Sequence, residues 1–490
     1  MGGFYDKINI EEDFLKGEAA YSNAAGSGKM KKQLSGIERI ALLAVELNRQ
    51  ALREKVENAA RLCLLDTLGV GIYGSAQPEA NLILDTAKRL GSGKVLVWGS
   101  GDKLDAGMAT MVCGSLCHLR ELDDVHYAIL HTGCVCVPAA MAAAQLEKAN
   151  LGQLLHAVVS GVEVMARISL GMDYMNHREQ GWHGTATCGA FGGAAAVGCL
   201  LGLNEIQLAD ALGIAGSRTG GTWAFSVDGT MSKRLHPGQA ARDGLLAAYL
   251  AQAGITGPHY VLEAEDGGFY RLFAQEWNIE RALAPRNRMA IEDVEYKWFA
   301  SCKSVHSPIT AARQIHQSAP SRGPGEVRRV LVEVNYSALS MAGHNYTEDS
   351  VVSAQISIPY GIALGLLGRT GQGADYTMET LKDPMIQMLA NKVIVVESEE
   401  FNLLRETEHL SGARVTVEWT DGEYTSATVK NPKGSLANPL TSNDIMEKFM
   451  SLTQPLLGQD GSERLMKLVM EGSPDTEIEQ LIQCLICRDL

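Results

Sequence analysis

The ten residues from Gly189 to Gly198 include four glycines and four alanines, and no charged side chain interrupts them. A helix made from such a segment has no polar face to turn toward water, so we expect it to be buried all round. Small side chains also let neighbouring backbones approach closely, which favours dense packing of helix against helix. This run therefore predicts a large core of closely packed helices.

Helical periodicity extends over most of the first half of the chain. From Ile37 onward, apolar residues recur at helical spacing, and similar segments follow up to about residue 255. The further segments expected to be helical cover residues 80–91, 105–118, 138–149, 153–168, 187–202, 206–216 and 239–253. The sequence thus predicts one large all-helical region.

The pattern changes between about residues 291 and 430. β-Branched runs occur at Val327–Val334, Val393–Val396 and Arg414–Trp419. Asp421-Gly422 then offers the two-residue turn of a hairpin that returns through Tyr424–Val429. These features predict a smaller α+β domain.

Helical spacing returns near the end of the chain, where Ser442 or Asn443 can cap a helix, and it continues at Leu465–Val469 and Ile478–Leu485. We expect these helices to rejoin the first domain. The predicted fold class is therefore mostly α, with a large all-helical domain built from both chain ends and an inserted smaller α+β lid domain. The expected boundaries are a polar N-terminal arm at 1–36, the helical domain at 37–290, the lid at 291–430 and the C-terminal part of the helical domain at 431–490.

Charge and composition narrow the possible partners and location. The formal net charge is −14 at pH 7, which makes nucleic acid an unfavourable partner. The apolar run Pro138–Gln145 is too short and too rich in alanine to cross a bilayer, and Met1–Asn9 lacks the features of a secretory signal. Ten cysteines in 490 residues form no dense framework, which fits a reducing, cytoplasmic setting.

Two motif-like patterns do not predict a metal or nucleotide site. Closely spaced cysteine pairs lack a second pair of cysteines or histidines at a finger-like distance, so we expect no metal there. Gly69–Gly74 matches the letters of a dinucleotide fingerprint, but it closes a helical segment where the fingerprint requires a preceding strand. We therefore expect no nucleotide cofactor.

Polar clusters interrupt this apolar sequence, and the first lies between Glu121 and His131. Together with Asp123, Asp124 and His126, these residues place three carboxylates and two imidazoles within eleven residues. Carboxylates this close raise imidazole pKa values and fix the tautomer of each ring. A capped, solvated junction between helix and loop would show the same pattern, so both interpretations stay open.

The second and third clusters each precede a helix rich in small residues. His183 lies where free amide groups favour a bound anion, although a lone histidine there is often structural. Lys233, Arg234 and His236 concentrate positive charge in an acidic chain, which predicts a pocket for an acidic ligand. An exposed basic turn would explain the same residues.

A fourth stretch opens the inserted domain, where Lys297, Lys303 and His306 are interleaved with aromatic residues. Ligand clefts often form at the boundary between domains, although an amphipathic surface strand is an alternative. Together the clusters supply acids, bases and cations, but they show no Ser-His-Asp order, metal cage or phosphate loop. They imply a small anionic substrate.

These segments, in this order, resemble the MmgE/PrpD family, which includes 2-methylcitrate dehydratases, cis-aconitate decarboxylases and an iminodisuccinate epimerase. The resemblance spans roughly residues 37–450. It rests on Glu121–Asp124 with His131, on Gly181–Gly184, on Lys233–Ala241, on Glu265–Phe269, and on Lys297 with Cys302 and His306.

The resemblance implies a homodimer that needs no organic cofactor and generally no metal. It also implies an active site between the domains, lined by Glu121, Asp124, His131, His183, Lys233, Lys297 and Cys302. The reactions of the family all build negative charge on a carbon next to a carboxylate or an imine, so a cationic group must stabilise that charge.

We assign the predicted roles on this chemical basis. Lys233 and Lys297 would stabilise the enolate-like intermediate, His131 and His183 would transfer protons, and Glu121 or Asp124 would orient a histidine or act as a base. The residues expected to bind substrate are Arg234, His236, Cys302, Lys303 and His306.

Three positions depart from the family pattern. Val125 stands where many members have threonine, Cys302 stands where the animal decarboxylases have histidine, and the tyrosine of those enzymes is missing around Gln355-Ile356. The segment around Ala300–Cys302 and His306 is closer to the fungal decarboxylases.

The expected function is therefore a cofactor-independent, cytoplasmic lyase acting on a small di- or tricarboxylate, either a 2-methylcitrate dehydratase-like hydro-lyase or a cis-aconitate decarboxylase-like enzyme. A racemase or epimerase of an aspartate-like diacid such as iminodisuccinate is the alternative. A non-catalytic helical scaffold is an alternative of another class. The expected partners are a small polycarboxylate and a second copy of the chain, with neither nucleic acid nor membrane.

Overall fold

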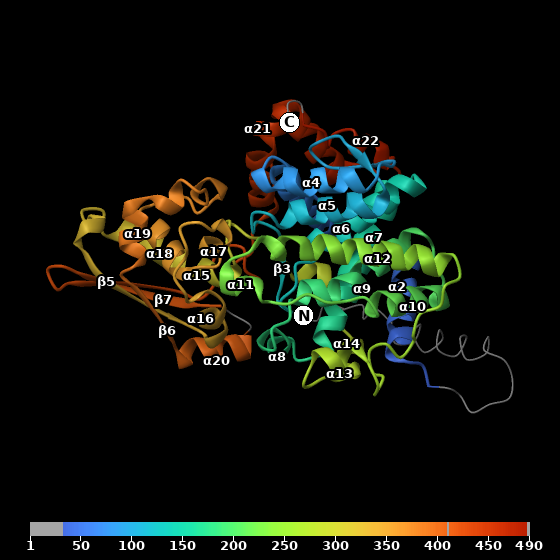
Figure 1. Cartoon of the computed structure of the whole chain (residues 1–490), viewed down its shortest axis with the longest axis horizontal. Coiled ribbons are helices and arrows are strands. Elements are labelled where there is room, and N and C mark those ends of the chain that lie inside the picture. Colours follow the sequence, from blue (N-terminus) through green and yellow to red (C-terminus); the bar gives the residue numbers. More distant parts are fainter. Residues whose placement is uncertain (1–32, 409–410, 488–490) are drawn as a thin grey trace, which may run out of the picture.

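Helices dominate the computed structural model, which describes residues 33–408 and 411–487 (Figure 1). This confirms the mostly α fold class. The predicted polar arm lies almost entirely within residues 1–32, outside the described residues. The two parts of the described chain are a large body of helices and a smaller unit that contains a four-stranded sheet (Figure 1).

The large body is formed by helices from both ends of the chain. Its first helices are α2 (Gly36–Arg49), α3 (Glu54–Ser75), α4 (Pro78–Leu90), α5 (Ala106–His118), α6 (Gly133–Glu147), α7 (Leu151–Leu170), α8 (Tyr174–Glu179), α9 (Gly184–Leu200) and α10 (Glu205–Gly216). They are followed by α11 (Phe225–Asp228), the 3-10 turn η1 (Met231–Leu235), α12 (His236–Gln252), α13 (Phe269–Phe273), α14 (Ile279–Leu283) and η2 (Ala290–Asp293). The C-terminal helices are α21 (Ser442–Glu471), which packs against α3, and α22 (Ile478–Ile482).

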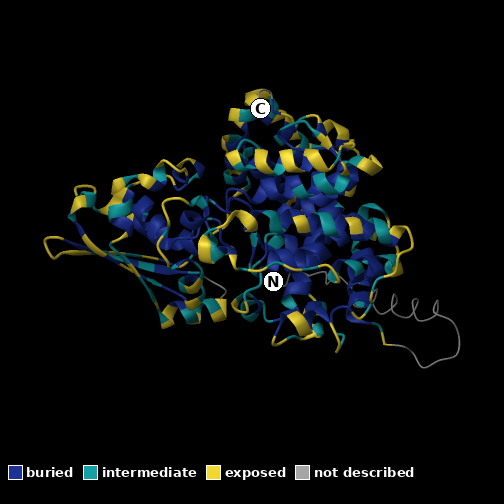
Figure 2. Cartoon of the chain, in the orientation of Figure 1, coloured by how far each residue is buried: buried dark blue, intermediate teal, exposed yellow. Residues whose placement is uncertain are grey.

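The Gly/Ala-rich helix α9 lies at the centre and packs against α7 and α12. Buried residues concentrate along these central helices, whereas exposed residues lie at the rim (Figure 2). A Cβ added to Gly161 of α7 would lie 2.8 Å from the carbonyl oxygen of Gly192 in α9. The small residues therefore permit direct contact between helix backbones, as the sequence predicted.

Helix α7 is long and apolar enough to span a bilayer, and within the described residues it is the one helix that is. However, 83% of its most apolar window is buried inside the helical body. Its sequence thus suits a core helix, and its N-terminus is fixed by a capping box between Asn150 and Gln153.

Two local predictions need revision. The cap of α21 is Thr441 rather than Ser442 or Asn443, because the Thr441 side chain accepts from the amide of Asp444 in a capping box. Helix α6 begins at Gly133, five residues before the predicted start at 138, although Pro138 lies inside it. The earlier start is stabilised by Asp124, whose carboxylate accepts from the amides of Thr132 and Gly133.

The glycine-rich segment Gly69–Gly74 lies inside α3, with no strand before it. A Cβ on Gly74 would come within 2.0 Å of the carbonyl oxygen of Leu116 in α5. These glycines allow close helix contacts, as expected for a segment that is not a nucleotide loop.

The smaller unit contains a mixed sheet with strand order β6-β5-β7-β8. Its strands are β5 (Val327–Val334), β6 (Val393–Glu397), β7 (Ala413–Trp419) and β8 (Tyr424–Val429), and only the β5–β6 pair is parallel. The predicted strands and the hairpin turn at Gly422, which has φ +88°, are all present. Val330, Val332, Val415 and Val417 alternate with more exposed residues and face the covered side.

Helices cover this sheet and connect it to the large body. They are α15 (Lys303–Ser318), α16 (Tyr336–Ala342), α17 (Val351–Gln355), α18 (Ile358–Leu366), α19 (Pro384–Ala390) and α20 (Glu399–Glu408), with 3-10 turns η3 (Pro324–Glu326), η4 (Gly373–Asp375) and η5 (Thr380–Lys382). Helix α15 packs against β7, β8 and α18.

Two short strand pairs complete the fold. The hairpin-like pair of β1 (Val95–Leu96) and β2 (Lys103–Leu104) lies in the helical body. The second pair joins β3 (Val125–His126) to β4 (Val294–Glu295) in antiparallel register. Since Glu121 lies just before β3 and Lys297 lies just after β4, this pair brings the first and fourth polar clusters together.

Candidate active site

The site is built around the segment that links α5 to β3, residues 119–124. Glu121 lies at its centre with φ +52°, the left-handed region that few residues other than glycine adopt. Its carboxylate is buried. The solvated helix–loop junction, left open as an alternative by the sequence, is therefore excluded.

Two lysines from distant parts of the chain converge on Glu121. Lys233 from η1 donates to Oε1, and Lys297, which lies between β4 and α15, donates to Oε2 at 3.0 Å. Both ammonium groups are buried, so neither an exposed basic turn at Lys233 nor a surface strand at Lys297 is present. The predicted convergence of these two lysines, which lie far apart in the chain, is what the structure contains.

The electrostatics of this trio favour ionised side chains. Burial opposes charge on Glu121, but Lys233 and Lys297 outweigh it and hold the pKa of Glu121 well below its ordinary value. Burial likewise opposes charge on Lys297, but Glu121 and Asp123 raise its pKa above the ordinary value. The site thus holds two fixed cations beside two carboxylates.

Three histidines border the lysines and carboxylates. The ring centroids of His118 and His131 are 4.7 Å apart, and His183 lies 6.1 Å from His118 and 6.3 Å from His131. His183 is the N-cap residue of α9, and its Nδ1 lies 2.9 Å from Nδ1 of His236, the first residue of α12. The second and third clusters therefore meet at this point.

Each histidine has a defined environment. Nδ1 of His131 lies 2.7 Å from the carbonyl oxygen of Asp124, an arrangement in which Nδ1 carries the proton and Nε2 is left for chemistry. Burial lowers the pKa of His183 well below the ordinary range, aided by His236 and Lys233, and burial lowers the pKa of His236 to about 4. His183 and His236 are therefore neutral near pH 7.

Asp123, rather than Asp124, supplies the carboxylate that contacts the histidines. Asp123 Oδ2 lies 2.7 Å from Nδ1 of His118 and 3.2 Å from Nδ1 of His131. The Asp124 carboxylate instead accepts from the Thr132 hydroxyl at 2.6 Å and from the amides at the start of α6. Asp124 therefore fixes the backbone that carries His131.

The residues expected to bind substrate divide into two groups. His236 contacts His183 and therefore lies at the site. Cys302, five residues after Lys297, is the N-cap residue of α15, and its amide donates to the Gln355 carbonyl at 2.8 Å, so it lies beside the site. The other three residues have different partners. Arg234 donates to the His118 carbonyl and to Gln355, and Lys303 contacts Glu295 and donates to the Gly434 carbonyl. The His306 ring contacts the Ser301 carbonyl. Their observed contacts are structural.

Side chains from three elements hold the backbone of the Glu121 segment. Arg234 donates to the carbonyl groups of His118 and Leu119. Gln355 of α17 donates to the Arg120 carbonyl at 3.0 Å, and Lys448 of α21 donates to the Leu122 carbonyl at 2.6 Å. We call these three residues the backbone clamp.

Several residues of this site had no predicted role, although Asp123 was part of the first polar cluster and Gln355 marked a departure from the family pattern. His118 and Asp123 form a buried pair at the centre, and Gln355 and Lys448 belong to the clamp. The signal for His118 was its position three residues before Glu121, which places both near one helix end. No local signal marks Lys448, because its partners lie hundreds of residues away in the chain.

Nitrogen atoms of His118, His131 and His183 lie within 4.8 Å of one another, and by geometry alone these atoms could hold a metal ion. His118, Asp123 and Cys134 form a second such group. The buried ammonium groups of Lys233 and Lys297 beside these side chains oppose a further cation and favour an anionic ligand.

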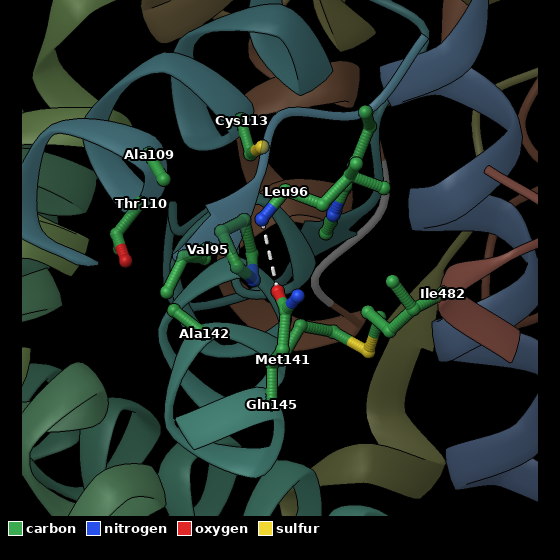
Figure 3. Close-up of a pocket in the computed structure, with 11 residues that line it drawn as sticks. Val95, Leu96, Ala109, Thr110, Cys113, Met141, Ala142, Gln145 and Ile482 are labelled. Carbon is green, nitrogen blue, oxygen red and sulfur yellow. Dashed lines mark hydrogen bonds between the residues drawn. The ribbon is translucent and has the colours of Figure 1, made fainter. Parts of the chain in front are cut away.

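A separate small cavity lies near β1 and the middle of α6 (Figure 3). Its walls include Val95, Ala109, Met141 and Ala142, and Gln145 accepts from the amide of Leu96 at 2.9 Å across it. The labelled side chains with oxygen or nitrogen atoms are Gln145, which is already bonded, and Thr110, whose buried hydroxyl has no hydrogen-bond partner within the described residues. The rest of the lining is largely apolar, so this cavity is a packing feature of the helical body.

Comparisons with known proteins agree with this arrangement. A family model described as the MmgE/PrpD N-terminal domain matches residues 38–282, and one described as the MmgE/PrpD C-terminal domain matches residues 299–471. A cis-aconitate decarboxylase of Aspergillus terreus is 29% identical over 454 residues, covering 87% of this chain and 91% of the relative.

Two further relatives are more distant. A cis-aconitate decarboxylase of Homo sapiens is 26% identical over 459 residues, covering 90% of this chain and 91% of the relative. A 2-methylcitrate dehydratase of Salmonella typhimurium is 23% identical over 411 residues, covering 77% of this chain and 81% of the relative.

Proposed function

The chain belongs to the MmgE/PrpD family and is a lyase of that type, and we propose that it decarboxylates cis-aconitate or a closely similar unsaturated tricarboxylate without a cofactor. The relative from Aspergillus terreus, which bears the name cis-aconitate decarboxylase, is more similar to the chain than the named dehydratase. The observation that carries the proposal is the convergence of Lys233 and Lys297 at one buried point.

The two lysines suit the charge that this reaction develops. When the bond to the leaving carboxylate breaks, carbon dioxide departs and the electron pair stays on the remaining carbon framework. That pair delocalises toward a neighbouring carboxylate, where Lys233 and Lys297 stabilise it. In a buried site, such fixed cations act far more strongly than in water.

A proton must then reach the carbon that held the electron pair. We propose His131 as the donor, because its Nδ1 is already engaged with the Asp124 carbonyl and its side chain is slightly exposed, which allows its proton to be replaced from solvent. Asp123, whose Oδ2 lies 3.2 Å from Nδ1 of the same ring, helps to orient the imidazole.

Glu121 has a dual role in this proposal. Its carboxylate neutralises both lysines before substrate arrives, which reduces the cost of burying two ammonium groups. A substrate carboxylate then competes for the same lysines. Glu121 thereby keeps the cations in place without leaving them unpaired.

Dehydration of 2-methylcitrate is the second candidate, favoured by the similarity to the Salmonella typhimurium enzyme. Removal of a proton beside a carboxylate builds the same kind of carbanion, so the same lysines would serve. Here neutral His183 is suited to act as the base.

The test is to incubate purified protein with cis-aconitate, citrate, 2-methylcitrate and iminodisuccinate separately. Carbon dioxide release from cis-aconitate supports the proposal, and water loss from 2-methylcitrate supports the second candidate. Racemisation of iminodisuccinate would instead identify the chain as a racemase or epimerase and refute both lyase assignments. Full activity after exhaustive dialysis against a chelator supports independence from metal. Lack of turnover with all four acids would refute these assignments.

We also propose that the chain acts as a cytoplasmic homodimer on a small polycarboxylate. The ten cysteines, all free within the described residues, support the cytoplasmic setting. Light scattering of the purified protein, giving the mass of one chain or two, tests the dimer.

A further inference from the structure

A groove outside the lysine cluster lies between the two parts of the molecule. It is lined by residues of α8 in the helical body and of α16 in the smaller unit. The lining residues are Met175, Arg178, Glu179, Tyr336, Ser337, Ser340 and Met341. A cation, hydroxyl groups and apolar side chains are thus gathered at the domain boundary, where ligand sites commonly form.

Arg178 differs from the other cations near the site. Lys233 and Lys297 are paired with Glu121, but within the described residues the Arg178 guanidinium has no ion pair or hydrogen bond, and its buried Nε is without a partner. A half-buried arginine normally satisfies its five donors with carboxylates or carbonyl groups. Its donors are therefore available to a ligand.

Trp223 connects this arginine to the lysine cluster. The guanidinium carbon of Arg178 lies 3.5 Å from the centroid of the Trp223 ring, and Lys233 Nζ lies 5.9 Å from the same centroid. The two cations are therefore no further apart than the sum of these distances, 9.4 Å. The Trp223 ring also contacts His183, with centroids 5.4 Å apart.

Trp223 adds a second available donor. Its indole Nε1 is buried and has no hydrogen-bond partner within residues 33–408 and 411–487. Arg178 and Trp223 are stacked on each other, and each therefore carries a buried donor, Nε and Nε1, that has no partner within the described residues. Buried donors without partners are costly unless a ligand accepts from them.

From these contacts we propose that Arg178 and the indole N–H of Trp223 form a carboxylate-binding subsite that anchors the carboxylate of a tricarboxylic acid that does not react. The lysine cluster holds the reacting end of the molecule, and the groove beside Ser337 and Ser340 admits the remote end. This inference rests on the proposed function for its substrate class. It assigns specificity for three carboxylates over two to a residue outside the lysine cluster.

Nearby charges are consistent with this subsite. Burial lowers the pKa of Arg178 to about 10, with Cys302 and Glu179 opposing the change, so the guanidinium remains charged at neutral pH. Glu179 lines the same groove and opposes an anion, but it is exposed and therefore well screened by water. Arginine is also the side chain best suited to bidentate binding of a carboxylate.

The experiment measures binding by calorimetry with two probes that are not turned over, tricarballylate and glutarate. Arg178→Gln should weaken tricarballylate binding about tenfold to a hundredfold, as expected for loss of a charge-assisted hydrogen bond, and should leave glutarate within about twofold. Arg178→Lys should restore part of the affinity. Glu179→Gln should bind tricarballylate as tightly as the parent or more tightly.

Arg218→Gln is the matched control, because Arg218 is an exposed arginine of the same domain whose nearest carboxylate, Asp243, is 4.0 Å away. It should change neither affinity. Equal binding of tricarballylate by the parent and Arg178→Gln, equal weakening of both probes, or no binding by the parent would each overturn the subsite. Lack of turnover with any acid, combined with selective loss in Arg178→Gln, would refute the proposed reaction and leave the subsite standing.

Discussion

Lys448 lies on the C-terminal helix α21, yet it should determine the geometry of the site. Its ammonium group is buried and donates to Asp66 of α3 at 2.7 Å and to the Leu122 carbonyl at 2.6 Å. Lys448→Met keeps most of the apolar stem and removes the charge. The substitution therefore isolates the contribution of the ion pair and of the clamp contact.

The expected loss follows from the burial of both partners, whose side chains are 5% and 1% exposed. Removing one member of a buried pair costs about 3–5 kcal/mol, because the other charge is left unpaired. Burial already raises the pKa of Asp66 to about 6 although Lys448 opposes this. Without the lysine, Asp66 takes up a proton near neutral pH, so we expect the lower end of that range.

Thermal unfolding measures the effect. In a cooperative unit of roughly 300 residues, the size of the helical body, a loss of 3 kcal/mol corresponds to a decrease in Tm of about 5 °C. Adding Asp66→Asn to Lys448→Met should recover part of it, because no buried charge remains. Lys467→Met, an exposed position on the same helix, serves as the control. A Tm within 1–2 °C of the parent for Lys448→Met, with no recovery in the double variant, would refute the reasoning.

Four other variants test the site. Lys297→Met and Lys233→Met should each lower kcat by about a hundredfold to a thousandfold, as expected for loss of a group that stabilises developing charge, with folding checked by circular dichroism. Gln355→Leu removes the acceptor of Arg234 and the donor to two carbonyl groups. Unfolding in urea should therefore show a decrease of about 1–3 kcal/mol in the free energy of unfolding. A midpoint equal to that of the parent would contradict the clamp. Burial lowers the pKa of His118 from its ordinary 6.5 to about 4. The stability that the neutral imidazole contributes is therefore complete above pH 6.5 and is lost as the pH falls toward 4. His118→Gln should accordingly show a smaller decrease in Tm between pH 7.5 and 5 than the parent.

Local patterns predicted most of the secondary structure. Strands β5 and β8 begin and end at the predicted residues, because alternating β-branched residues and a two-residue turn act over short distances. The helices of the large body were also recognisable, since their apolar spacing is a property of each segment alone. The start of α6 was not, because it depends on Asp124, which lies nine residues before Gly133.

The site was predictable where residue type carries the chemistry. Lys233, Lys297 and His131 were expected to take part in the reaction, and the structure brings them within one cluster. Arg234 had the same appearance in the sequence, but it donates to backbone carbonyl groups of His118 and Leu119. A cation that binds substrate and one that holds a loop differ only in their three-dimensional neighbours, so the sequence could not separate them.

The backbone clamp follows from the conformation of Glu121. A residue other than glycine at φ +52° costs roughly 1–3 kcal/mol and persists only when its surroundings fix it. The left-handed turn also removes the neighbouring carbonyl groups from any helix, and buried carbonyl groups need donors. Arg234, Gln355 and Lys448 supply those donors from η1, the smaller unit and the C-terminal helix. The strain that points Glu121 at two lysines is therefore compensated only when all three parts of the chain have assembled, which links the geometry of the site to completion of the fold.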